Sequence, residues 1–269
     1  MLIQRQFNDW SQFASTIESR IGETCWHEAS TRTSSWYAEF SQTGSLQDAV
    51  DLVRNGWPEG TQKLIDGLEA FDAGRMVSPV PTIEWDVAGE CPDVAAYCAG
   101  IPEHMATQEF ETEQSSPLVS ISVNGAAAWR IDSSRIIRYG VMIASHVRAL
   151  LQAGYSPRLD WCCALNGNGR KNYLMTVPLL ERGETVDIDR IAFAIAHPSM
   201  LRRAMFAVAE IEGWRGLGQS MGSVMNTLPA EIADDYDVSL PGIGSLSAFM
   251  DTDENAKAAV SPYFNQFNE

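Results

Sequence analysis

Lysine and arginine are scarce in this chain of 269 residues, and neither occurs between Met76 and Trp129. Nineteen basic residues face 35 acidic ones, so the formal net charge is −16. Affinity for nucleic acid comes mainly from neutralised phosphates, and an acidic surface is also repelled by anionic lipid. We therefore expect neither general DNA binding nor binding to a membrane surface.

Long apolar runs are also missing, and the chain turns polar at Gln4, so we expect neither a membrane span nor a secretory leader. Cysteine is present only as an irregular, odd-numbered set of five, and the four histidines are scattered without the short spacing of a zinc site. These features predict a reduced, intracellular protein that holds no metal and no cofactor.

The common nucleotide-binding motifs are absent as well. There is no G-x-G-x-x-G and no G-x-x-x-x-G-K-[ST]. His197-Pro198-Ser199 is compact, but a serine at a helix start is an ordinary cap. Because no nucleophile and base can be paired, we expect no catalytic residues and no enzyme activity.

The charge that is present divides the chain into three segments. Residues 1–115 carry a net −13, residues 116–229 a net +4 and residues 230–269 a net −7. We expect an acidic, mostly helical N-terminal region, a central sheet domain and an acidic C-terminal extension with one strand at 236–240 and an irregular end.

In the first segment, Asp9–Arg20 shows apolar residues at helical spacing, and Ser45 with Asp48 predicts a capped second helix. A turn at Trp57-Pro58-Glu59-Gly60 follows that helix.

The central segment has a clearer pattern. Leu118–Val123 alternates like a strand, and a helix from about Ser133 to Gln152 follows. The next strand, Arg158–Leu165, is joined by Asn166-Gly167-Asn168-Gly169 to a return strand at 173–179. This order predicts an α/β fold in which a βαβ unit carries an antiparallel edge strand.

The same order resembles the start of a von Willebrand factor A (vWA) domain, a Rossmann-like sheet domain that often binds a metal after its first strand. The metal motif of that family, D-x-S-x-S, corresponds here to Asn124-Gly125-Ala126-Ala127-Ala128. Hard divalent cations need charged or hydroxyl oxygen ligands, which these residues lack. The resemblance therefore implies a vWA-like fold with a degenerate metal site.

Three further segments, residues 55–60, 97–105 and 196–203, resemble bacteriophage and prophage proteins with a degenerate vWA-like second half. This resemblance implies a phage origin and a location in the host cytoplasm or on the virion. It brings no catalytic residues with it.

From these observations we expect a non-catalytic, phage-encoded interaction protein, an adaptor or accessory factor, that binds a host or phage protein. The candidate contact residues are Trp57, Glu59, Asn124, Arg170, Lys171, Arg202 and Arg203. Two alternatives stay open: an acidic DNA mimic that blocks a host DNA-binding enzyme, and nucleic-acid binding by the basic central segment. The oligomeric state also stays open.

Overall fold

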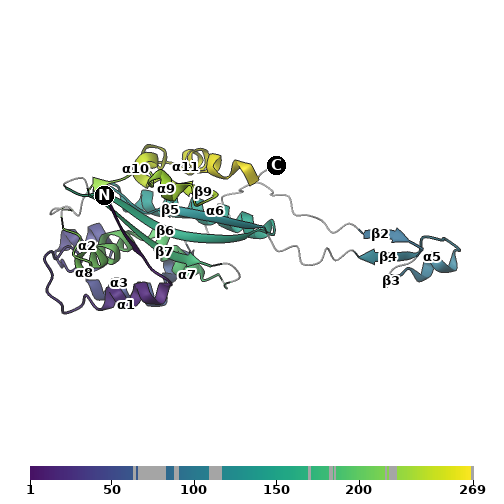
Figure 1. The fold of residues 1–269 in the computed structure, drawn as a ribbon, viewed down its shortest axis with the longest axis horizontal. Coiled ribbons are helices and arrows are strands. Elements are labelled where there is room, and N and C mark those ends of the chain that lie inside the picture. Colours follow the sequence, from purple (N-terminus) through teal and green to yellow (C-terminus); the bar gives the residue numbers. More distant parts are fainter. Residues whose placement is uncertain are drawn as a thin grey trace.

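A mixed, mostly parallel sheet forms the centre of the molecule (Figure 1). The computed structural model describes residues 1–62, 65, 83–87, 91–108, 117–168, 171–181, 184, 186–215, 217 and 223–267. The strand order is β1-β7-β6-β5-β9, and the short β8 pairs with the end of β6. The strands are β1 (Leu2–Gln6), β5 (Leu118–Asn124), β6 (Ser156–Asn166), β7 (Asn172–Leu180), β8 (Ser223–Val224) and β9 (Val238–Leu240).

The predicted strand–helix–strand unit is present. Strands β5 and β6 are parallel and are connected by α6 (Ser133–Gln152). The return strand β7 is antiparallel to β6, as the Asn-Gly turn indicates. The expected α/β class is therefore confirmed.

Strands from all three charge-defined segments pair in this one sheet. β1, from the acidic N-terminal region, is parallel to β7, and β9, from the C-terminal extension, is parallel to β5. The boundaries expected at 115/116 and 229/230 therefore do not divide the sheet. Residues 109–116, which include the first boundary, lie outside the described residues.

Helices cover one face of the sheet. α6 packs against α7 (Ile188–Ala196), and Gly140 permits their close approach, because a Cβ at this position would lie 2.5 Å from that of Ala196. The predicted capping box of Ser45 and Asp48 begins α3. The other helices packed around this core are α1 (Trp10–Glu18), α2 (Ser35–Ser41), α3 (Leu46–Asn55), the π-helical segment η1 (Met200–Met205) and α8 (Phe206–Ile211).

The opposite face of the sheet has a smaller apolar cluster. Cys163 belongs to the large helical core, whereas its neighbour Cys162 packs with Leu174 and Leu228 on the other side. Adjacent residues of a strand point to opposite faces, so both cysteines are buried. The short helix α9 (Ala230–Ala233) contributes to this second cluster.

The C-terminal residues were expected to be irregular, and this expectation is wrong. They form α10 (Ile243–Leu246), a 3₁₀ turn at Ser247–Phe249, α11 (Asp253–Val260) and a 3₁₀ segment at Ser261–Phe267. The ring of Phe264 stacks on that of His146 in α6 at 4.4 Å. This packing joins residues more than a hundred positions apart, so local sequence signals could not show it.

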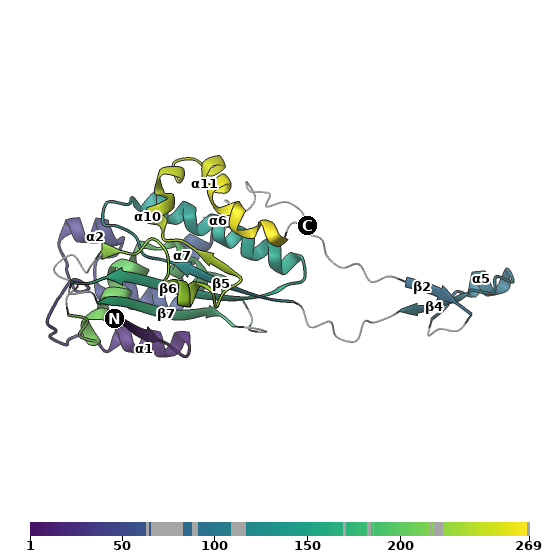
Figure 2. The ribbon, with the colours of Figure 1, turned by 45° about the horizontal axis from the view of Figure 1, so that its top comes forward.

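A second, three-stranded antiparallel sheet is drawn apart from the main one in Figures 1 and 2. Its strand order is β2-β4-β3, and it carries one short helix. We call residues 83–108 the small unit; its elements are β2 (Ile83–Asp86), β3 (Cys91–Pro92), α5 (Val94–Cys98) and β4 (Met105–Gln108). In the described part of the chain, no helix has both the length and the apolar character needed to cross a bilayer.

Candidate functional site

The carboxyl ends of β5, β6 and β9 meet at one edge of the main sheet, because these strands are mutually parallel. Open α/β sheets usually bind ligands at this edge. Two hollows lie here, a small cavity beside the end of β5 and a large groove next to it.

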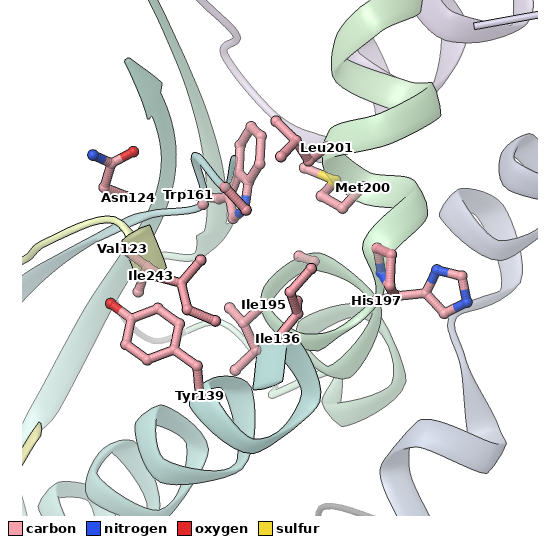
Figure 3. A pocket seen from close by; sticks show the side chains of 14 residues that line it. Val123, Asn124, Ile136, Tyr139, Trp161, Ile195, His197, Met200, Leu201 and Ile243 are labelled. Atoms are coloured by element: carbon pink, nitrogen blue, oxygen red, sulfur yellow. The ribbon is translucent and has the colours of Figure 1, made fainter. Parts of the chain in front are cut away.

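The small cavity holds about 20 Å³, which is room for roughly one water molecule. Figure 3 shows that its walls are mostly apolar side chains, with Trp161 and Tyr139 facing Ile195 and Met200. The hydroxyl of Tyr139 donates to the carbonyl of Pro241 at 2.6 Å. The cavity is therefore too small for an organic ligand.

Asn124 also lines this cavity and is fully buried. Its Oδ1 accepts from the backbone N–H of Ala126 at 3.1 Å, and its Nδ2 donates to the carbonyl of Met225 at 2.9 Å. The side chain thus holds the loop after β5 against the segment before α9. Next to it, a Cβ on Gly125 would lie 2.1 Å from Nε1 of Trp161, so the indole occupies the space beside this loop.

The metal motif of the vWA resemblance falls on this loop. Ala126, Ala127 and Ala128 offer methyl groups, and Asn124 uses both ends of its amide within the protein. Among the described residues, no group of three or more His, Cys, Asp or Glu side chains could hold a metal ion. The local chemistry is therefore that of a structural loop.

The groove is much larger, with a volume of about 750 Å³. Trp36 of α2 and Trp129 of the loop after β5 flank it, and their side chains are 58% and 72% exposed. The ring of Trp36 is stacked on that of Phe40, with centroids 5.1 Å apart and planes 9° apart. Large apolar side chains with this exposure at the edge of a cavity are typical of a binding surface.

The charged side chains that line the groove are Arg32, Arg130 and Arg202, and no carboxylate joins them among the described residues. Arg130 is exposed. The groove is thus a basic site on a protein of net charge −16. We call it the arginine–tryptophan groove.

Arg202 is 2% exposed and is fixed in place by the protein. Its guanidinium donates to the carbonyls of Phe40 and Ile131 and lies 4.0 Å from the centre of the Phe40 ring. Burial lowers the pKa of Arg202 to about 10, so it stays protonated at neutral pH. Its Nε is buried as well and has no hydrogen-bond partner among the described residues.

The contact residues expected from sequence are scattered through the fold. Trp57 is buried, with its ring edge-to-face with that of His197 at 4.6 Å, whereas Glu59 and Lys171 are exposed. Arg170 lies outside the described residues. Of the six candidates that the structure describes, Arg202 alone lines the groove.

Arg203 is fully buried and joins η1 to the N-terminal segment. It donates to the carbonyls of Ser30, Arg32 and Thr43 and to the hydroxyls of Ser41 and Thr43. The groups within hydrogen-bond distance of its guanidinium are neutral oxygens. Arg203 and Trp57 line neither of the two hollows and are packed inside the protein, so both are structural residues.

Sequence reasoning missed Trp36 as a site residue. Its signal was local, since α2 has three aromatic residues in seven and the exposed one faces outward. The sequence could not show that Trp129 lies across the groove from Trp36, because the two residues are 93 positions apart in the chain.

A separate polar hollow of about 310 Å³ lies beside β1 and β7. Asp160 is buried next to it, accepting from the hydroxyl of Tyr236 at 2.7 Å and from Arg158 at 2.8 Å. Burial raises the pKa of the Asp160 carboxyl, because desolvation disfavours its charged form. Among the described residues, the nucleophilic side chains that line this hollow are hydroxyls, and Cys162 is buried with its pKa raised to about 12.

Comparison with protein families matches residues 2–268 to one domain of unknown function, DUF7192. No curated protein and no solved structure matches the chain. The match covers nearly the whole chain, so this protein belongs to the DUF7192 family.

Proposed function

We propose that this protein is a non-catalytic binding protein and that its ligand site is the arginine–tryptophan groove. The ligand we propose is a protein segment that carries carboxylates beside apolar side chains. The observation that supports this most is the pairing of two exposed tryptophans with a lining whose described charged groups are all arginine.

The chemistry of the groove suits such a segment. Protein interfaces are enriched in tryptophan and arginine, because aromatic rings contribute large apolar contacts and guanidinium groups bind carboxylates with two hydrogen bonds. The buried Arg202, held by two backbone carbonyls, places a fixed positive charge at the wall of the groove, and Arg32 and Arg130 are exposed there to a ligand carboxylate.

A nucleic-acid ligand fits less well. A net charge of −16 repels a polyphosphate over the whole approach, whereas a short acidic segment carries few charges and gains apolar contact. Arg138, one of the basic residues that could have extended the surface, is bound to Asp253 at 2.7 Å.

The resemblance to vWA domains and to phage proteins supports the same proposal. The order β5, α6, β6, β7 agrees with that resemblance, and vWA-like domains commonly bind proteins at this edge. On this basis we propose a degenerate vWA-like fold of phage origin, with a host or phage protein as the partner.

A binding assay with defined probes tests the proposal. Labelled 15-residue peptides that combine Asp or Glu with Trp, Tyr, Val or Ile are titrated by fluorescence anisotropy, beside copies with Asn and Gln in place of the acids and a dT15 oligonucleotide. We expect acidic peptides to bind, their amide copies to bind at least tenfold more weakly, and R130E to cost at least tenfold.

The matched control is R148E, which makes the same charge change on an exposed residue in the carboxyl-terminal half of α6. It should change affinity less than twofold. The proposal is overturned if no peptide binds, if R130E and R148E behave alike, or if the oligonucleotide binds in the groove in preference to every peptide.

A further inference from the structure

We infer that the segment that fills the arginine–tryptophan groove comes from a second copy of this chain, namely its small unit, residues 83–108. This inference rests on the proposed function, because it names the partner of the same groove. When the small unit of one copy binds the groove of the next, the copies are joined head to tail.

The first argument is the exposed apolar surface of the small unit. Val87, Val94, Tyr97 and Ile101 are 63%, 67%, 65% and 49% exposed, and no residue of α5 is buried. A short three-stranded sheet needs a hydrophobic face, or packing against a helix, to be stable by itself, and the described residues of α5 leave their apolar side chains in water. These side chains therefore need a cover that the unit does not supply.

The second argument is charge. Residues 83–108 contain five acidic residues and no Lys or Arg, and Asp86 and Glu103 are exposed. The groove offers three arginines and no carboxylate among its described lining residues. Both surfaces combine exposed aromatic or aliphatic groups with charge, and the charges have opposite signs, which favours their association.

The third argument is position, which favours docking between copies over docking within one. After the small unit, the described chain continues at residue 117, next to the amino end of β5 in the main sheet. The groove lies beyond the carboxyl end of the same strand. Figure 1 shows α2, which lines the groove, and the small unit at opposite ends of the sheet. The seven residues of β5, which separate these two ends, span about 23 Å.

Eight residues, 109–116, connect the small unit to β5 on that side. Fully extended, they reach at most about 28 Å, which leaves little length to pass around the sheet and enter the groove of the same chain. A groove on a neighbouring molecule has no such constraint.

Contact of this kind is heterologous, since it uses two different surfaces, and it produces chains or rings. We therefore expect the mass of the full-length protein, measured by light scattering after size exclusion, to rise with concentration above the 29.6 kDa of one chain.

The decisive experiment mixes two full-length variants. R130E damages the groove and keeps the small unit, whereas V94D/Y97D damages the small unit and keeps the groove. Each alone should remain a monomer at all concentrations, and an equimolar mixture should form a one-to-one dimer that grows no further. R148E should associate as the wild type does.

Each other outcome overturns the inference. If wild type is a monomer throughout, or if both variants still associate, the small unit does not fill the groove of another copy. A monomer whose groove binds acidic peptides only in the V94D/Y97D variant shows docking within one chain. If the peptides of the previous section bind wild type fully while it stays monomeric, the proposed function stands and only the second copy is rejected.

Discussion

Replacing Glu210 with glutamine removes the charge from a buried ion pair while keeping the shape of the side chain. The Glu210 carboxylate is 2.8 Å from Nε of Arg20, and both side chains are at most 2% exposed. It also accepts from the backbone N–H and the hydroxyl of Ser30, at 3.0 and 2.6 Å. This cluster ties the N-terminal segment to α8.

Breaking a buried pair by removing one partner typically costs 3–5 kcal/mol, because an uncompensated charge is left behind. Glutamine keeps an oxygen that can still accept from Ser30, so we expect a loss near the lower end, about 3 kcal/mol. For a chain of this size 1 kcal/mol shifts the melting temperature by roughly 2–4 °C, so E210Q should melt about 6–12 °C lower.

The control lies two residues away. Glu212 is 3.1 Å from Nε of Arg5, but both side chains are about one-third exposed. Exposed pairs contribute about 0–1 kcal/mol, so E212Q should shift the melting temperature by no more than about 2–4 °C. Calorimetry or circular dichroism measures both variants in the same buffer. Equal shifts for the two would refute the argument that burial determines the size of the effect.

Three further predictions concern packing and pH. G140A should destabilise the protein by about 1–3 kcal/mol in thermal melts, because the new Cβ would lie 2.9 Å from Cα of Ala196. This cost should exceed the gain from the higher helix propensity of alanine. A variant as stable as the wild type would contradict the α6–α7 contact. Burial raises the pKa of Asp160, so the free energy of unfolding should fall as pH rises from about 3.9 through the raised value, and D160N should remove that slope in urea titrations. Burial lowers the pKa of His146, so its contribution is complete above about pH 6.5 and is lost as pH falls through the depressed value. H146F, which keeps a ring against Phe264, should abolish this acid dependence; an unchanged pH profile would refute it.

The elements that local patterns describe were predictable. The alternation of Leu118–Val123, the Asn-Gly turn after β6 and the apolar stripe of α6 each arise from neighbours in the chain, and the strand–helix–strand order follows from them. The Ser45–Asp48 capping box is equally local, since it satisfies backbone groups within one helical turn.

β1 and the C-terminal helices were not predictable in the same way. β1 is an edge strand whose side chains are exposed or half-buried, so it lacks a strong alternation of apolar and polar residues. It is recognised as a strand only because β7 offers it backbone partners. The helical C-terminus likewise depends on α6, against which it packs.

By itself, the sequence determined the fold class, the central βαβ unit and the shortage of positive charge, because periodicity, turn residues and composition are properties of the chain. Only the tertiary structure decided where the few arginines lie. It buried Arg203 among carbonyl oxygens and brought Arg32, Arg130 and Arg202 beside Trp36 and Trp129. Net charge adds over all residues, whereas a binding site depends on which side chains meet in space, and contacts across more than a hundred positions are set by packing of the whole core.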